Sequence, residues 1–368
     1  MTAEKRGVRK IILLVFWPLG FILSSTAVYF PKYVEDYYTL RFSKVVAGGL
    51  SRLTGIFSFS LAEVIVLLLL LFFIFAFFRM LIRVISRKKD EGKKKGLLSF
   101  LLNILVFLGI IYFCFMIIWG LNYQRLSFAE IAGYKTNGFS EKELEQLCDK
   151  LIVKANNLRS SLKEDEHGVM KYEGGFDGIR NLAPQAYSRA ALIYPELGGK
   201  FGKPKPVFFS FLMSYTGISG IYFPFTAEAN VNIDIPDCLL PATTCHEMAH
   251  QRGFAREDEA NYLAWLTCNN IKNAEFNYSG TLFALIYAIN ALSEQNPDLT
   301  RELQKKYGEG LSKDLQAVSQ YWEKYEGKAE KIATDINDTY LKSNKQEQGV
   351  RSYGRMVDLL LAEQRTKK

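Results

Sequence analysis

Residues 239–265 read LLPATTCHEMAHQRGFAREDEANYLAW, and this stretch organises the interpretation of the whole chain. It holds His246, Glu247 and His250 in an HExxH pattern. Residues four apart lie on one face of a helix, so the two imidazoles could bind one zinc ion while Glu247 reaches a water molecule beside it. Pro241 suits the first turn of such a helix and Gly253 suits its end. The pattern therefore predicts a metal-binding helix.

A catalytic zinc site of this kind needs a third protein ligand. Arg256 stands where an HExxHxxGxxH pattern would place a third histidine, which leaves Glu257 and Glu259 as the near candidates. Glu257 and Asn261 are four residues apart and share one face of the following predicted helix, whereas Glu259 points roughly the other way. We predict Glu257 as the third ligand, with Glu259 as the alternative, and Asn261 as a residue that supports the ligands.

The first third of the chain contains three long apolar runs, at about residues 11–30, 61–83 and 97–121. Runs of about 18–25 apolar residues are long enough to cross the hydrocarbon core of a bilayer as a helix. We therefore predict a membrane region over residues 1–121 and a separate domain over residues 122–368. The two glycines at 48 and 49, between the first two runs, indicate an interfacial or re-entrant piece.

Basic residues predict the orientation of these spans, because Lys and Arg in short flanks stay in the cytoplasm. Twelve lie before the first run, at the end of the second or between the second and third, and four lie between the first and second. The twelve are Lys5, Arg6, Arg9, Lys10, Arg79, Arg83, Arg87, Lys88, Lys89, Lys93, Lys94 and Lys95, and the four are Lys32, Arg41, Lys44 and Arg52. We predict a multi-pass protein of the cell membrane with a cytoplasmic N-terminus and an extracytoplasmic C-terminal domain, whether or not the first run is a cleaved signal.

The net charge of +8 does not indicate a nucleic-acid partner. Residues 1–120 hold 16 basic and 6 acidic side chains, whereas residues 121–368 hold 30 and 32. The basic excess therefore lies beside the apolar runs, where membrane lipid is the expected neighbour, and the C-terminal domain has no basic excess that would track phosphates.

The C-terminal domain has an α+β pattern, with strands in the middle and helices around them. Helices are predicted over 141–161 and 180–192, a strand over 207–212, extended structure over 221–235, and mostly helix from Cys238 onward. Pro224 favours an edge strand. We predict that residues 227–233, with Ala229, Asn230 and Val231 at their centre, form an edge that pairs with extended substrate.

Other candidate residues carry weaker signals. Hydrolysis of an amide needs a group that stabilises the oxyanion, and Tyr353 is the first candidate for it. His167, the third histidine, lies in a polar stretch and is interpreted as a surface residue. The cysteines at 148, 238, 245 and 268 are interpreted as small buried hydrophobic residues, and no disulfide is assigned.

The residues from His246 to Asn261 resemble those of the zincin metallopeptidases, in particular the gluzincin branch with HExxH followed by E-x-x-[AS]-D. The gap from His250 to Glu257 is shorter than in gluzincins, and Asn261 replaces the Asp. Most of the chain more closely resembles an uncharacterised bacterial membrane family of zincin-like proteins with an H-E-x-A-H-Q-x-G-F-A-x-E-D-E-A-N core. That resemblance includes YFPFTAEANVN at 222–232 and SYGRMVDLLLA at 352–362.

These resemblances imply a membrane-anchored α+β protein, in which three transmembrane helices precede a zincin-like metallopeptidase domain. The implied function is zinc-dependent hydrolysis of peptide or protein substrates outside the cytoplasm, with one Zn²⁺ per chain and Glu247 and Tyr353 in catalytic roles. Two alternatives remain open. One is a catalytically inactive receptor or assembly protein on a zincin scaffold, and the other is a zinc amidase acting on a non-peptide substrate of the cell envelope.

Overall fold

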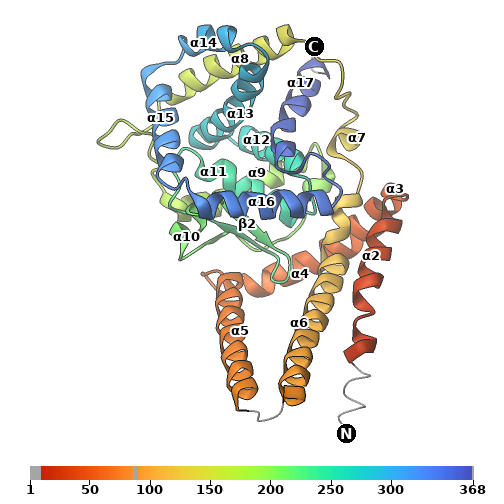
Figure 1. The fold of residues 1–368 in the computed structure, drawn as a ribbon. Coiled ribbons are helices and arrows are strands. Elements are labelled where there is room, and N and C mark those ends of the chain that lie inside the picture. Colours follow the sequence, from red (N-terminus) through yellow and green to blue (C-terminus); the bar gives the residue numbers. More distant parts are fainter. Residues whose placement is uncertain (1–9, 87–89, 367–368) are drawn as a thin grey trace. The chain divides into compact units, whose positions relative to one another are not determined.

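The computed structural model describes residues 10–86 and 90–366, and the chain divides into two compact units (Figure 1). The first unit comprises Met1–Ser43 and Leu61–Arg125, and the second comprises Lys44–Ser60 and Leu126–Lys368. The boundary therefore lies close to the one expected at residue 121, but Lys44–Ser60, the latter part of the segment between the first two apolar runs, belongs to the second unit.

Within the described residues, three helices of the first unit are long and apolar enough to cross a membrane. These stretches are Lys10–Ala27, Leu61–Ile82 and Gly96–Ile118, and they involve α2 (Phe16–Ala27), α5 (Leu61–Ile85) and α6 (Asp90–Ile118). The first ends before residue 30 because Pro31 begins the short helix α3 (Pro31–Tyr33), which leads into the π-helix η1 (Val34–Ser43). Of the basic residues that predict the orientation, Lys5, Arg6, Arg9, Arg87, Lys88 and Lys89 lie outside the described residues.

Several buried polar side chains of the first unit are paired with one another. Arg125 donates from Nε and Nη2 to the two carboxylate oxygens of Glu35 at 2.8 and 2.7 Å, and both side chains are almost fully buried. Asn122, in η2 (Gly120–Gln124), interacts with Thr39 and Ser43 of η1. The bidentate geometry offsets part of the cost of removing two charges from water.

The second unit is mostly helical, as expected from Cys238 onward. The bounds of its helices are α4 (Lys44–Thr54), α7 (Phe128–Ala132), α8 (Glu141–Arg159), α9 (Gly175–Ala190), η3 (Pro195–Leu197), α10 (Ser210–Ser214), α11 (Leu240–Gln251), α12 (Glu257–Asn269), α13 (Ala274–Gln295), α14 (Pro297–Gln304), α15 (Glu309–Glu323), α16 (Lys328–Ser343), η4 (Gly349–Arg355) and α17 (Met356–Thr366). The expected helices over 141–161 and 180–192 correspond to α8 and α9. α8 begins at a capping box between Ser140 and Glu143, which satisfies two backbone N–H groups at its start.

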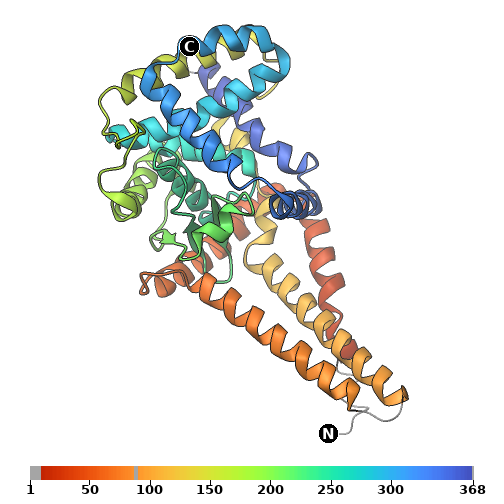
Figure 2. The same ribbon diagram turned by 60° about the vertical axis from the view of Figure 1, so that its left-hand side comes forward.

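The core of the second unit lies where α11, α12 and α13 pack on one another and on α8 and α9 (Figures 1 and 2). Ile152, Ile179, Leu263 and Leu282, from four of these helices, are fully buried. α11 is buried along its whole length, from Leu240 to Gln251, so a helix with four polar or charged residues in its last turns lies in the interior. A buried polar helix needs a specific partner for its polar groups.

One small mixed sheet lies beside α11, with strand order β1–β3–β2. β1 (Lys205–Pro206) pairs parallel with β3 (Glu228–Val231), and β2 (Gly220–Phe223) pairs antiparallel with it. The strand predicted over 207–212 is wrong, because pairing ends at Val207 and the helix α10 follows. The β-branched and aromatic residues of this run favour a strand only where a partner and a packing surface exist, and Phe208 is 82% exposed.

The edge-strand prediction is also wrong in its placement. Ala229, Asn230 and Val231 lie in β3, the central strand, and are fully buried between β1 and β2. They cannot pair with a substrate, because their strand already has a neighbour on both sides. Pro224 does mark an edge, since it directly follows β2, which pairs with β3 alone in the described part of the chain.

Candidate metal centre

His246 and His250 come together because α11 is a regular helix in this region. Pro241 occupies its first turn, and Gly253, with φ of +83°, follows its end. The Nε2 atoms of the two imidazoles lie 3.0 Å apart, and both side chains are nearly buried. The predicted sharing of one helical face is therefore confirmed, with both rings directed at one point.

Glu257 completes the cluster from the first residue of α12. Its Oε2 atom lies 3.2 Å from Nε2 of His246 and 3.4 Å from Nε2 of His250. One ligand atom from each of the three residues lies within 4.8 Å of the others. α12 packs against α11, so the short spacing after His250 still brings the carboxylate to the imidazoles.

Glu259 lies outside this cluster. Its Oε1 atom accepts hydrogen bonds from the backbone N–H of Phe128, at 2.9 Å, and from Nη1 of Arg256, at 3.1 Å. Glu259 thus links α12 to α7, and it also bonds to Arg256, which directly precedes α12. The geometry favours Glu257 over Glu259 as the carboxylate beside the two histidines, as the helical-face argument predicts.

A backbone carbonyl orients one of the two imidazoles, that of His250, for an ion. Nδ1 of His250 lies 2.8 Å from the carbonyl oxygen of Phe254, which suits a tautomer with the proton on Nδ1 and the lone pair on Nε2. Oε2 of Glu257 and Nδ1 of His246 are buried and lack a hydrogen bond in the described structure. Two imidazoles and a carboxylate are a donor set that zinc prefers, so these residues fit the metal.

The electrostatics of the cluster favour a positive charge at its centre. Burial raises the pKa of the Glu257 carboxyl, but the two imidazoles outweigh it and hold the pKa at about 2. Burial lowers the pKa of His250, but Glu257 and Glu247 outweigh it and raise the pKa to about 9. The carboxylates thus stabilise a cation beside the imidazoles, which a bound metal ion would supply in place of a proton.

Glu247 lies next to the cluster but is held apart from it. Its Oε1 atom is 4.0 Å from Nε2 of His246, and the carboxylate accepts a hydrogen bond from the backbone of Tyr222 in β2. Burial, only partly offset by the two imidazoles, raises the pKa of Glu247 to about 7. A carboxyl that titrates near neutral pH is suited to accept and return a proton.

Gly220 makes room for this carboxylate. A Cβ atom at residue 220 would lie 2.5 Å from Oε1 and 2.7 Å from Cδ of Glu247, closer than any non-bonded contact allows. Nothing in the sequence pattern distinguishes Gly220 from an ordinary turn glycine. The packing of β2 against α11 gives it this role.

We expect Gly220→Ala to displace the Glu247 carboxylate while leaving His246, His250 and Glu257 in place. In the hydrolytic role that we propose for Glu247 below, activity should fall by about a hundredfold, because a misplaced general base loses most of its contribution. Zinc content should stay at the wild-type value. The matched control is Gly327→Ala, since a Cβ at residue 327 would meet nothing within 4 Å. Equal losses of activity in both variants would contradict the proposed role of Gly220.

Tyr353 reaches the site from η4, far along the chain. Its ring lies parallel to that of His246, with centroids 6.5 Å apart, and its hydroxyl accepts a hydrogen bond from Nδ2 of Asn337 at 3.3 Å. Burial, reinforced by the charge of Glu257, raises the pKa of Tyr353 well above its usual value, so the hydroxyl keeps its proton. Nδ2 of Asn261 donates a hydrogen bond to the backbone carbonyl of Tyr353 at 3.0 Å. Asn261 therefore positions η4, and this bond does not support a metal ligand as we predicted.

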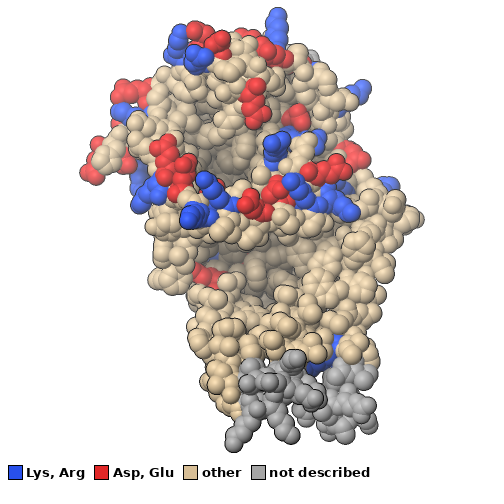
Figure 3. Space-filling model, viewed as in Figure 1, with Lys and Arg blue, Asp and Glu red and all other residues tan. Residues whose placement is uncertain are grey.

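A cavity of about 430 Å³ opens onto these residues. Its lining includes His246, Glu247 and Tyr353. Much of the remaining wall is apolar and comes from α13 and α15, including Phe283, Ile286, Val318 and Trp322. The face of the second unit between α15 and α16 is visibly hollowed, above a band of charged side chains along α16 (Figure 3). These apolar wall residues lie on helices without a motif, so the sequence alone does not point to them.

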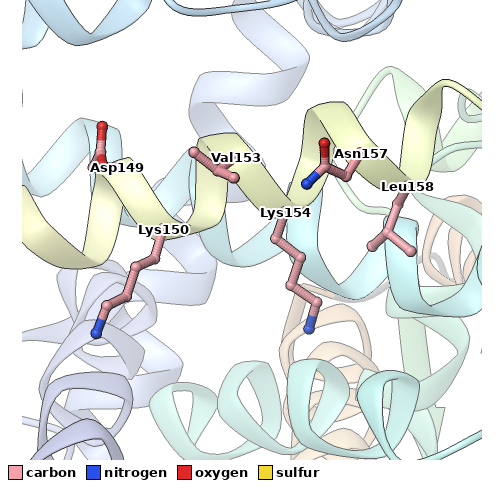
Figure 4. A pocket seen from close by; sticks show the side chains of 6 residues that line it. All are labelled: Asp149, Lys150, Val153, Lys154, Asn157 and Leu158. Atoms are coloured by element: carbon pink, nitrogen blue, oxygen red, sulfur yellow. The ribbon is translucent and has the colours of Figure 1, made fainter.

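Two other features lie away from the cluster. His167 is an exposed residue beside Glu166, as expected for a surface position. A second concavity, on the outer face of α8, is lined by Asp149, Lys150, Val153, Lys154, Asn157 and Leu158 (Figure 4). It contains none of the predicted site residues.

The fold and the site define a mostly helical protein with three helices apolar enough to span a membrane and a buried His–His–Glu cluster. A family described as "Protein of unknown function (DUF3810)" matches residues 38–361, and the chain belongs to this family. No curated protein and no solved structure matches the chain. The match includes the whole cluster, the cavity-lining helices and two of the three apolar helices.

Proposed function

We propose that the chain is a membrane-anchored, zinc-dependent metallopeptidase of the zincin type, with its site outside the cytoplasm. The observation that carries the proposal is the buried cluster of His246, His250 and Glu257 beside Glu247, with His246 and Glu247 lining a cavity. Three protein ligands with one side open to a cavity are typical of catalytic zinc sites, whereas structural sites are closed by a fourth ligand. The extracytoplasmic location follows from the basic flanks of the apolar runs.

In this proposal each residue has a separate task. A zinc ion held by the two imidazoles and Glu257 would supply Lewis acidity toward a water molecule and a carbonyl oxygen. Glu247, buried beside His246, takes the proton of the attacking water and returns it to the leaving nitrogen. Tyr353, protonated and beside His246, donates its hydroxyl hydrogen to the oxyanion that forms in the cavity.

β2 takes over the substrate-binding role that β3 cannot have. In the antiparallel pair, Ile221 and Phe223 lie opposite Asn230 and Glu228, and the other side of β2 faces Glu247 through the backbone of Tyr222. An extended peptide could add to this edge by backbone hydrogen bonds, which tolerate many sequences. The apolar wall opposite suits a large apolar side chain of that peptide.

Trp322→Ala tests the apolar wall. For peptides with a large apolar residue next to the cleaved bond, we expect KM to rise about tenfold with little change in kcat, because the lost contact is ground-state binding. Peptides with a small residue at that place should be cleaved at the wild-type rate. The control is Trp265→Ala, since Trp265 lies in α12 and outside the cavity lining. A uniform effect on all peptides would argue against a specificity role.

The decisive experiment offers the purified full-length chain, loaded with zinc, a peptide library and a set of cell-wall amides. New peptide termini that are absent with Glu247→Gln would support the peptidase. Release of amide fragments without peptide cleavage would favour the zinc amidase. The inactive-receptor alternative depended on the short spacing before Glu257, and the 3.2 Å approach of Glu257 to His246 removes that reason.

A further inference from the structure

We propose that one side of the second unit, formed by α4, the loop 55–60 and the segment 206–215, is a docking surface for the lipid bilayer. We call it the interfacial surface. The three parts lie along the same side of the second unit in both ribbon views (Figures 1 and 2). The proposal is independent of catalysis and concerns how the folded domain meets the membrane.

α4 has its polar and apolar faces reversed relative to a helix of a soluble protein. Its small residues Gly48, Ser51 and Thr54 face the domain and are buried, and Thr54 donates to the backbone carbonyl of Thr226 at 3.0 Å. Its large apolar residues are exposed instead, with Val45 at 72% and Leu53 at 63%. Water would penalise this arrangement, whereas the apolar zone of a bilayer interface would stabilise it.

The side chains on the inner face of α4 must be small, because the backbone of α4 lies very close to the backbone at Gly202. A Cβ atom at residue 202 would lie 2.1 Å from the carbonyl oxygen of Ser51, and the N–H of Gly202 donates to Oγ of Ser51 at 3.1 Å. This contact fixes which face of α4 points outward. The exposed apolar face is therefore a property of the folded second unit.

The loop that follows α4 is held against the domain by a buried lysine. Nζ of Lys205, in β1, donates to the carbonyl oxygens of Thr54 and Phe59 at 3.0 and 3.1 Å and is paired with Glu228. Ile56 is nevertheless 76% exposed. Its apolar side chain thus extends outward from a loop whose backbone is held.

The segment after β1 continues the same character. Residues 206–227 contain no charged side chain, although Phe208 is 82% and Leu212 51% exposed. Residues 53–62 are likewise uncharged. Exposed apolar residues without interspersed charge are unusual on a surface that faces water and typical of one that meets another apolar phase.

Chain connectivity identifies the bilayer as that phase. α4 ends at Thr54, and α5, the most hydropathic of the candidate spans, begins seven residues later at Leu61. Seven residues reach at most about 25 Å, so α4 must lie within that distance of the point where α5 enters the membrane. Arg52, exposed beside Leu53, suits the phosphate groups at that depth.

The test uses nitroxide labels on the full-length chain in vesicles of phosphatidylethanolamine and phosphatidylglycerol. Single cysteines replace Leu53 and Phe208 in a Cys114→Ala background, where the remaining cysteines are buried. The matched control is Val153→Cys, because Val153 is an equally apolar residue, 51% exposed on α8. Circular dichroism of each variant verifies that the domain is folded.

We expect the ratio of oxygen to nickel-chelate accessibility at residues 53 and 208 to exceed that at residue 153 several-fold, since oxygen concentrates in lipid and the chelate in water. Equal ratios at all three positions would overturn the proposal, because the surface would then face water. Shielding of residues 53 and 208 from both reagents would also overturn it, in favour of a protein partner or a second copy of the chain.

Discussion

We expect the wild-type chain to bind zinc at about one ion per molecule, and His246→Ala, His250→Ala and Glu257→Ala each to lose it. A bound zinc ion is stabilised by about 10–16 kcal/mol spread over its ligands, so removing one of three protein ligands should cost about 4 kcal/mol, close to a thousandfold in affinity. The measurement is elemental mass spectrometry of the purified full-length chain, followed by competition with a chelator of known affinity.

Glu259→Gln is the control for this experiment, because it is a neighbouring buried carboxylate that contacts Phe128 and Arg256 and lies outside the cluster. It should retain zinc. If instead Glu259→Gln loses zinc and Glu257→Ala keeps it, the third ligand is Glu259. If the wild-type chain takes up no zinc when zinc is offered, the cluster does not bind this metal and the peptidase proposal fails.

Glu247→Gln should reduce hydrolysis by up to about ten-thousandfold while zinc stays at one ion per chain. The amide keeps the shape of the carboxylate but cannot accept the proton of the attacking water. The measurement is the rate of peptide cleavage at saturating zinc, with metal content determined on the same samples. Circular dichroism of the variant should verify its fold, because Glu247 contacts β2 through the backbone of Tyr222.

Glu145→Gln is the matched control, since it makes the same chemical change on α8, away from the cavity. It should leave the cleavage rate unchanged. Cleavage by Glu247→Gln at the wild-type rate would remove Glu247 from the mechanism. A loss of both activity and zinc would instead make Glu247 a structural support for the metal centre.

The chain contains several features that local sequence patterns predict correctly. The apolar runs predict the three candidate spans, and the HExxH pattern, Pro241 and Gly253 predict α11 with its two histidines on one face. The helix predicted to follow, with Glu257 and Asn261 on one face, is α12. These features depend on hydropathy and on helical periodicity, which act over a few neighbouring residues.

Other features of the site depend on contacts between distant segments. The run at 207–212 has strand propensity but finds no partner strand beyond Val207, and β3 becomes central because β1 arrives beside it. Strand order is a pairing between segments far apart in the sequence, so local propensity cannot predict it. The same holds for Gly220, whose role exists only because β2 packs against α11.

The sequence by itself determined the chemistry available to this protein: three apolar helices, and a helix that carries two imidazoles and a carboxylate at metal-binding spacing. The shared helical face favours Glu257 as the carboxylate that joins the imidazoles, and the structure brings it there, but the tertiary structure alone decided which strand is the edge and that α4 belongs to the folded domain. The physical reason is range. Helix formation and the length of an apolar run depend on adjacent residues. The order of strands in a sheet, the assembly of a ligand set and the face that a helix buries depend on packing between segments that only the folded chain brings together.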